Sequence, residues 1–85
     1  MFITYILFSE ILQKFYIGFT SGDINIRLSK HLASHSGFTS KVKDWKVVYL
    51  EYFDSKKGAM DREKQLKSWK SNARVRELIS RSLSE

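Results

Sequence analysis

The N-terminal part of the chain contains an uncharged run of seven residues, FITYILF, at positions 2–8. A membrane-spanning helix needs about 20 apolar residues. A secretory signal needs a positive segment before its apolar core and a cleavage pattern after it, and this run has neither. Aromatic and β-branched residues of this kind favour strands. We therefore predict that residues 2–8 form a buried strand.

Length and cysteine usage limit the kinds of protein that this chain can be. The 85 residues are enough for one domain, residues 1–85, with a single modest core. Hydrophobic residues make up 42% and charged residues 28%, as in globular proteins. The chain has no cysteine, which excludes disulfides, thiolate nucleophiles and cysteine-bound zinc. This usage fits the cytoplasmic location that we expect.

Periodicity and capping residues divide the chain into six elements. The predicted strands are residues 2–8, 15–18 and 45–53. Three helices are predicted: the first ends near residue 34, the second spans about 55–69, and the third begins at about 72. Candidate helix caps are Ser21 or Asp23, Asp54 or Ser55, and Asn72. The order β-β-α-β-α-α predicts an α+β fold, with a small three-stranded antiparallel sheet flanked by helices.

Alternation along the strands predicts which side chains share a face of the sheet. Tyr16 and Gly18 should point to the same side, and Gly18 leaves space there for another group to approach closely. In the third strand, the same alternation predicts that Val47, Tyr49 and Glu51 share one face.

Three charged or polar residues stand beside or within the apolar stripes of the predicted helices. Arg27 and His31 are four residues apart and lie next to the stripe of the first helix. Glu63 falls within the stripe of the second helix, between Ala59 and Leu66. Burial of a carboxylate without a partner is costly, so Glu63 should pair with a cation or a metal.

The chain has a net charge of +6 and a sequence pI of about 9.7, and the excess is uneven. Residues 41–81 contain twelve lysines and arginines against six acidic residues. A basic surface attracts polyanions and favours nucleic acid as a partner, although it can also serve solubility alone. The candidate phosphate-contacting residues are Lys41, Lys64, Lys67, Lys70 and Arg74.

Taken in order, these residues resemble the GIY-YIG nuclease superfamily in its small standalone form. The second family motif is complete as Tyr16-Ile17-Gly18, and Ile3-Thr4-Tyr5 matches the first motif except for its glycine. Arg27, His31 and Glu63 match the arginine, histidine and metal-binding glutamate of the family. The resemblance covers residues 2–70.

The resemblance implies a metal-dependent endonuclease with one metal ion, Mg²⁺ or Mn²⁺, held by Glu63. Tyr5 would serve as general base, as a phenolate or by passing the proton onward, and His31 would hydrogen-bond to it or share its proton. Tyr16 would position the water or a phosphate oxygen, and Arg27 would grip the scissile phosphate. The expected substrate is DNA, cut with little intrinsic sequence specificity in repair or recombination.

Several alternatives remain open at this stage. Each tyrosine could be an ordinary core residue with one hydrogen bond, and Glu63 could form a structural ion pair with a lysine of a neighbouring element. His31 and His35 could be read as a zinc pair, but no third ligand stands out. The missing first glycine would also suit a nucleic-acid-binding module that no longer cuts, and a third possibility is a domain activated by a protein partner.

Overall fold

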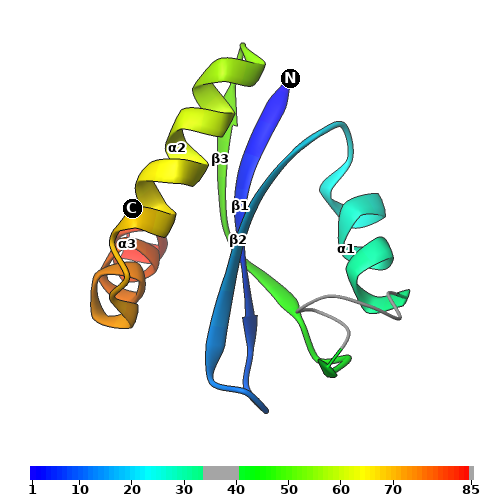
Figure 1. Ribbon diagram of the computed structural model, residues 1–85, viewed down its shortest axis with the longest axis vertical. Helices are drawn as coiled ribbons and strands as arrows, with labels where there is room; N and C mark the ends of the chain where they lie inside the picture. Colours follow the sequence, from blue (N-terminus) through cyan, green and yellow to red (C-terminus); the bar gives the residue numbers. More distant parts are fainter. Residues whose placement is uncertain (34–40, 85) are drawn as a thin grey trace.

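The computed structural model describes residues 1–33 and 41–84, and its elements follow the predicted order (Figure 1). They are β1 (Phe2–Ser9), β2 (Lys14–Ser21), α1 (Ile24–Ala33), β3 (Lys46–Phe53), α2 (Lys56–Ser68) and α3 (Asn72–Ser84). The α+β class is therefore confirmed. The predicted end of the first helix at residue 34 lies outside the described residues. Within those residues, no helix is both long enough and apolar enough to cross a membrane.

The sheet has the strand order β2-β1-β3, and both neighbouring pairs are antiparallel. The uncharged run at the N-terminus thus becomes the central strand, and Ile3 to Leu7 are all buried. A strand covered on both faces needs a continuous apolar sequence, which explains this run. β2 is longer than the predicted 15–18 because all eight of its residues pair with β1, including Tyr5 with Gly18.

The helices cover opposite faces of the sheet, with α1 on one side and α2 and α3 on the other (Figure 1). Alternate residues of β1 pack into two separate hydrophobic cores. Ile3, Tyr5 and Leu7 pack with Trp45 and with the apolar side chains of α1. Ile6, on the other face, packs with Leu66 of α2 and with α3. Odd-numbered residues of β1 between Ile3 and Leu7 therefore face α1, and even-numbered residues face α2 and α3.

A β-bulge in the pairing of β1 with β3 corrects one prediction. Ile6 pairs with Tyr49, but Leu7 pairs with Val47, so Val48 is an extra residue in β3. Strict alternation fails at this point because the extra residue rotates the strand. Val47 consequently packs in the core under α1, whereas Tyr49 packs on the opposite face, where α2 lies. The predicted common face for Val47, Tyr49 and Glu51 is therefore wrong for Val47.

Side chains satisfy the first backbone amides of the helices. Asp23 accepts a hydrogen bond from the amide of Asn25 at 2.7 Å, and Ser55 accepts one from Gly58 at 3.1 Å, as predicted. α3 is different: Ser71 accepts from the amide of Arg74 at 3.3 Å, so Asn72 is the first helical residue and the predicted Asn72 cap is wrong.

Candidate active site

The site is centred on Tyr5, whose side chain is 0% exposed in the middle of β1. Two side chains from α1 meet its hydroxyl. Arg27 donates a hydrogen bond from Nε to Tyr5 Oη over 3.3 Å, and His31 Nε2 lies 2.9 Å from the same oxygen. Arg27 and His31 are one helical turn apart, so both reach the α1-facing side of the sheet. The structure thus brings together three of the residues predicted from sequence.

The directions of the pKa shifts describe how protons are held in this cluster. Burial raises the pKa of Tyr5 above its usual 10.0, although the hydrogen bond and the charge of Arg27 act in the other direction. Burial, with the positive charge of Arg27, lowers the pKa of His31 below 6.5. Both side chains are therefore neutral near pH 7. A Tyr5 phenolate near neutral pH would need a lowered pKa, and the pKa of Tyr5 is raised instead. The neutral imidazole of His31 is therefore a better proton acceptor than the neutral Tyr5 hydroxyl.

Gly18 is required by the position of the Tyr5 ring. It pairs directly with Tyr5 in the neighbouring strand, and a Cβ placed on it would lie 2.6 Å from Tyr5 Oη and 2.8 Å from Tyr5 Cζ. No real side chain fits at such distances. The space predicted beside Gly18 is therefore filled by the Tyr5 hydroxyl, and the glycine of the Tyr-Ile-Gly sequence has a physical reason.

Tyr16 lies next to this cluster on the same face of the sheet. Its ring packs edge-on against His31, with centroids 4.9 Å apart and planes at 64°. Trp45 also packs edge-on against Tyr16, with ring centroids 6.5 Å apart and planes at 68°. Tyr16 is half-buried, so part of it is open to solvent. The predicted common face for Tyr16 and Gly18 is confirmed, and Tyr16 connects the buried cluster to the surface.

Glu63 lies on α2, which packs against β1 and β2 from the face of the sheet opposite α1 (Figure 1). Its side chain is 18% exposed, and its carboxylate lies 3.6 Å from Lys67 Nζ. Burial is the main reason for the raised pKa of Tyr5, and the negative charge of Glu63 adds to it, which places Glu63 in the electrostatic environment of Tyr5. Glu63 therefore has the expected cation partner, but this lysine belongs to the same helix, not to a neighbouring element.

The donor set at Glu63 suits a hydrated hard cation. Across residues 1–33 and 41–84, no group of three or more histidine, cysteine or acidic side chains could hold a metal by itself. A single carboxylate fits Mg²⁺, because this ion keeps most of its waters and takes further oxygens from a substrate phosphate. The alternative zinc pair of His31 and His35 is not formed by described residues, because His35 lies outside them.

The five basic residues predicted to contact nucleic acid occupy different places. Lys67 and Lys70 line a groove of about 310 Å³ beside β2, which we call the β2 groove; its other lining residues include Phe15, Tyr16, Leu66 and Asn72. Arg74 instead lies over the ring of Trp69, at 4.4 Å from its centroid. Lys41 and Lys64 are exposed, and neither lines the β2 groove.

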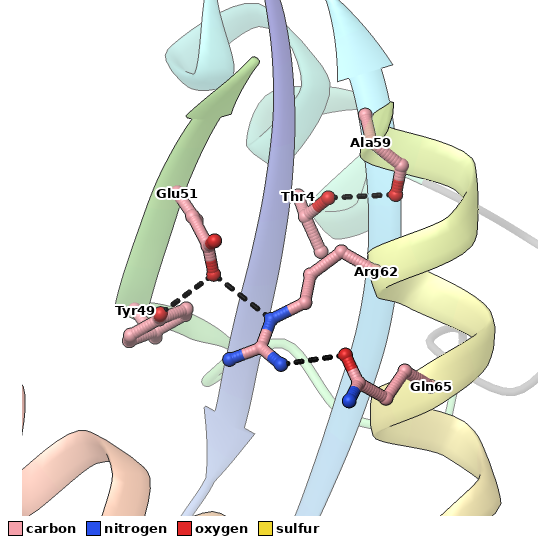
Figure 2. Close-up of polar contacts among 6 residues, drawn as sticks. All are labelled: Thr4, Tyr49, Glu51, Ala59, Arg62 and Gln65. Carbon is pink, nitrogen blue, oxygen red and sulfur yellow. Dashed lines mark hydrogen bonds and ion pairs between the residues drawn. The ribbon is translucent and has the colours of Figure 1, made fainter. Parts of the chain in front are cut away.

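A polar network that the sequence does not predict fixes α2 against β3 (Figure 2). Arg62 donates to Glu51 over 3.0 Å and to Gln65 over 2.7 Å, and the Tyr49 hydroxyl donates to Glu51 over 2.8 Å. On β1, Thr4 donates to the carbonyl of Ala59 over 2.8 Å. These contacts flank Glu63 along α2 and hold the rotation of the helix. Alternation predicted that Tyr49 and Glu51 share a face, but no local pattern predicts that Arg62 of α2 packs against that face.

The family model for the GIY-YIG catalytic domain matches residues 1–76 of the chain. Searches of curated proteins and of solved structures give no match. The match covers most of the 85 residues and includes Tyr5, Tyr16, Gly18 and the helices that carry Arg27 and Glu63. Because the model spans this whole arrangement, the chain belongs to the GIY-YIG family, whose catalytic domains are generally nucleases.

Proposed function

We propose that this protein is a metal-dependent endonuclease that hydrolyses phosphodiester bonds in DNA with little sequence specificity of its own. The observation that supports this most directly is the buried Tyr5 hydroxyl held between Arg27 and His31. A tyrosine that served only the core would need one hydrogen-bond partner. Two partners of different proton affinity, one a permanent cation and the other a neutral base, suit proton transfer beside a phosphate.

In this proposal, Tyr5 passes a proton and does not store charge. Tyr5 is 0% exposed, so the cluster must first open to admit the attacking water. The water would then give a proton to Tyr5 Oη while the hydroxyl proton of Tyr5 moves to Nε2 of neutral His31. The raised pKa of Tyr5 and the lowered pKa of His31 both fit this order, because neither group starts charged at neutral pH. Arg27 uses Nε for Tyr5, which leaves its two Nη groups for oxygens of the scissile phosphate. Tyr16 would orient the water from the open side of the cluster.

Glu63 would hold the divalent cation, Mg²⁺ or Mn²⁺, which when bound neutralises charge on the phosphate and on the leaving oxygen. Lys67 must then leave the carboxylate, and its 53% exposed side chain is free to turn. In the proposal Lys67 moves to a backbone phosphate in the β2 groove, which Lys70 also lines. Binding of the metal by Glu63 and binding of DNA by Lys67 would thus both favour separation of the Glu63–Lys67 ion pair.

The test is cleavage of supercoiled plasmid and of branched DNA with Mg²⁺ or Mn²⁺. Wild type should cut only with metal, and Glu63→Gln should abolish this activity. Arg27→Ala should lower it by about 100-fold or more, as expected for loss of a phosphate-stabilising donor. Glu77→Gln is the matched control, because Glu77 forms the same type of i,i+4 pair, with Arg81, away from the site. Failure to cut any of these substrates, or equal cutting by Glu63→Gln, would contradict the proposal.

A second candidate is a nucleic-acid-binding module without nuclease activity. Ile3 stands where the family motif has its glycine, and its side chain is buried in the core under α1. A bulky residue at that place favours a structural use of the strand. Salt-dependent DNA binding without cleavage would support this candidate.

We further propose that the nuclease acts in the cytoplasm, in DNA repair or recombination, either alone or activated by a protein partner. If so, it should cut branched DNA in preference to plain duplex DNA.

A further inference from the structure

The β2 groove continues into a second groove on the same side of the molecule. This aromatic groove has a volume of about 340 Å³ and lies between the sheet and α3; its main lining residues are Phe8, Phe15, Lys46, Val48, Arg76 and Ile79. Phe15 lines both grooves. Tyr16, which packs against His31, lines the β2 groove. Both grooves lie on the α2 and α3 side of the sheet, opposite the Tyr5 cluster, and Tyr16 in the edge strand β2 is the link between the two sides. A path would therefore run from the cluster around the edge at Tyr16 into the β2 groove, and past Phe15 to the middle of α3.

We propose that this path binds a single strand of DNA, and that an unpaired base of the substrate stacks in the aromatic groove. The inference rests on the proposed nuclease function and gives it a substrate class, namely DNA with an unpaired segment beside the cut. The strand would pass Tyr16, run along Lys67 and Lys70, cross Phe15 and place its base beside Phe8.

The charge of the two grooves suits a sugar–phosphate backbone. Lys67 and Lys70 line the β2 groove, and Lys46 and Arg76 line the aromatic groove, whereas no acidic residue lines either one among the described residues. Lys46 has an acidic neighbour, Glu10, but at 3.9 Å and with both side chains largely exposed. Such a pair is weak. The path therefore has the basic lining of a channel for single-stranded nucleic acid.

The aromatic groove offers a stacking surface of the kind that binds bases. The rings of Phe8 and Phe15 lie 4.9 Å apart at 42°, and both are only partly buried. The guanidinium of Arg76 lies 5.6 Å and 5.4 Å from their centroids. A base can stack on an aromatic ring while a guanidinium covers the stack or meets its phosphate. Bases in a duplex already stack on one another, so a groove with these features selects an unpaired base.

The backbone of Lys70 supports a role for the β2 groove. Lys70 links α2 to α3 with φ 50, in the left-handed region. A glycine would adopt this conformation without strain, whereas another residue is disfavoured by about 1–2 kcal/mol. The chain nevertheless places a lysine here, and that lysine lines the groove.

Binding of fluorescein-labelled oligodeoxythymidine, followed by anisotropy in EDTA, tests the proposal without metal or cleavage. A hairpin duplex of equal nucleotide number is the comparison. Wild type should bind the single strand more tightly than the duplex. Phe8→Leu should weaken single-strand binding about 5- to 100-fold, the range for loss of one stacked base. Arg76→Ala, at an exposed position, should also weaken it and serves if Phe8→Leu fails to fold.

Arg81→Ala is the control, because Arg81 is also an exposed arginine of α3 but lines neither groove. It should bind the single strand as wild type does. Equal binding of single strand and duplex by wild type, or unchanged binding by folded Phe8→Leu and Arg76→Ala, would overturn the strand path. Because the assay needs no cleavage, that result would leave the nuclease proposal intact, whereas absence of plasmid cleavage would overturn the nuclease function alone.

Discussion

Replacement of Gly18 by alanine tests whether the strand pairing really holds the Tyr5 hydroxyl in place. The new methyl group would lie 2.6 Å from Tyr5 Oη and 2.8 Å from Tyr5 Cζ. To reach an ordinary contact of about 3.5 Å, the ring must shift by about 1 Å. Tyr5 is fully buried, so it cannot make this shift without moving its neighbours or losing the 2.9 Å contact with His31.

The expected cost combines two terms. Overpacking of a core costs about 1–3 kcal/mol, and loss of one hydrogen bond adds about 1 kcal/mol. Gly18→Ala should therefore lower the free energy of unfolding by about 2–4 kcal/mol, out of the roughly 4–13 kcal/mol expected for 85 residues. With a urea m-value near 1.5 kcal/mol/M, the unfolding midpoint should fall by about 1–3 M. Metal-dependent plasmid cleavage should fall as well, since the Tyr5–His31 geometry is disturbed.

The assay is urea unfolding followed by tryptophan fluorescence, with Gly58→Ala as control. A Cβ at Gly58 would lie 3.1 Å from a Phe53 ring carbon, a milder contact, and alanine is favoured in a helix by about 1 kcal/mol. Gly58→Ala should thus be close to neutral. Adding Tyr5→Phe to Gly18→Ala removes the closest oxygen and should restore part of the stability but not the cleavage. An unchanged midpoint for Gly18→Ala would refute the reasoning.

Three further predictions concern pH and the contacts of α2. Because the native state keeps His31 neutral, with a pKa below 6.5, wild type should lose unfolding free energy as pH falls below 6.5, and His31→Gln should not show this loss in parallel urea titrations. Hydrogen bonds from the Ser9 hydroxyl and the Ile11 amide lower the pKa of Asp44 below 3.8. The ionised Asp44 should therefore stabilise the folded protein above pH 3.8, and this contribution should be lost as pH falls through the folded-state pKa. Thermal melts of Asp44→Asn should lack this pH-dependent step. Arg62→Met should cost about 1 kcal/mol, because the ion pair with Glu51 is partly exposed, and a double-mutant cycle with Glu51→Gln that gives no coupling would contradict the network.

The candidate site residues of β1, β2 and α1 could be predicted from sequence because their positions depend on local periodicity. Parity in β1 and β2 places Tyr5, Tyr16 and Gly18 on one face, and helical spacing places Arg27 and His31 beside them. These rules need only regular strands and helices. They failed in β3, where a single extra residue, Val48, changes the face of everything on one side of it.

Other features depend on contacts between elements far apart in the chain. The sequence predicts a cation or a metal at Glu63, with a lysine of a neighbouring element as one alternative. The cation in the structure is Lys67 of the same helix, because side chains four apart on one helix readily meet. The network of Arg62 with Glu51 requires the approach of α2 to β3. No local pattern contains that information.

The sequence by itself determined the elements, their order, the burial of residues 2–8 and the family, because uncharged runs, helical stripes and motif residues act within one or two elements. The tertiary structure decided the proton state of the cluster: burial, which no local pattern measures, raises the pKa of Tyr5 and lowers that of His31. It also decided that Phe15 joins two basic grooves, since that junction forms only where α2 and α3 pack against the same face of the sheet.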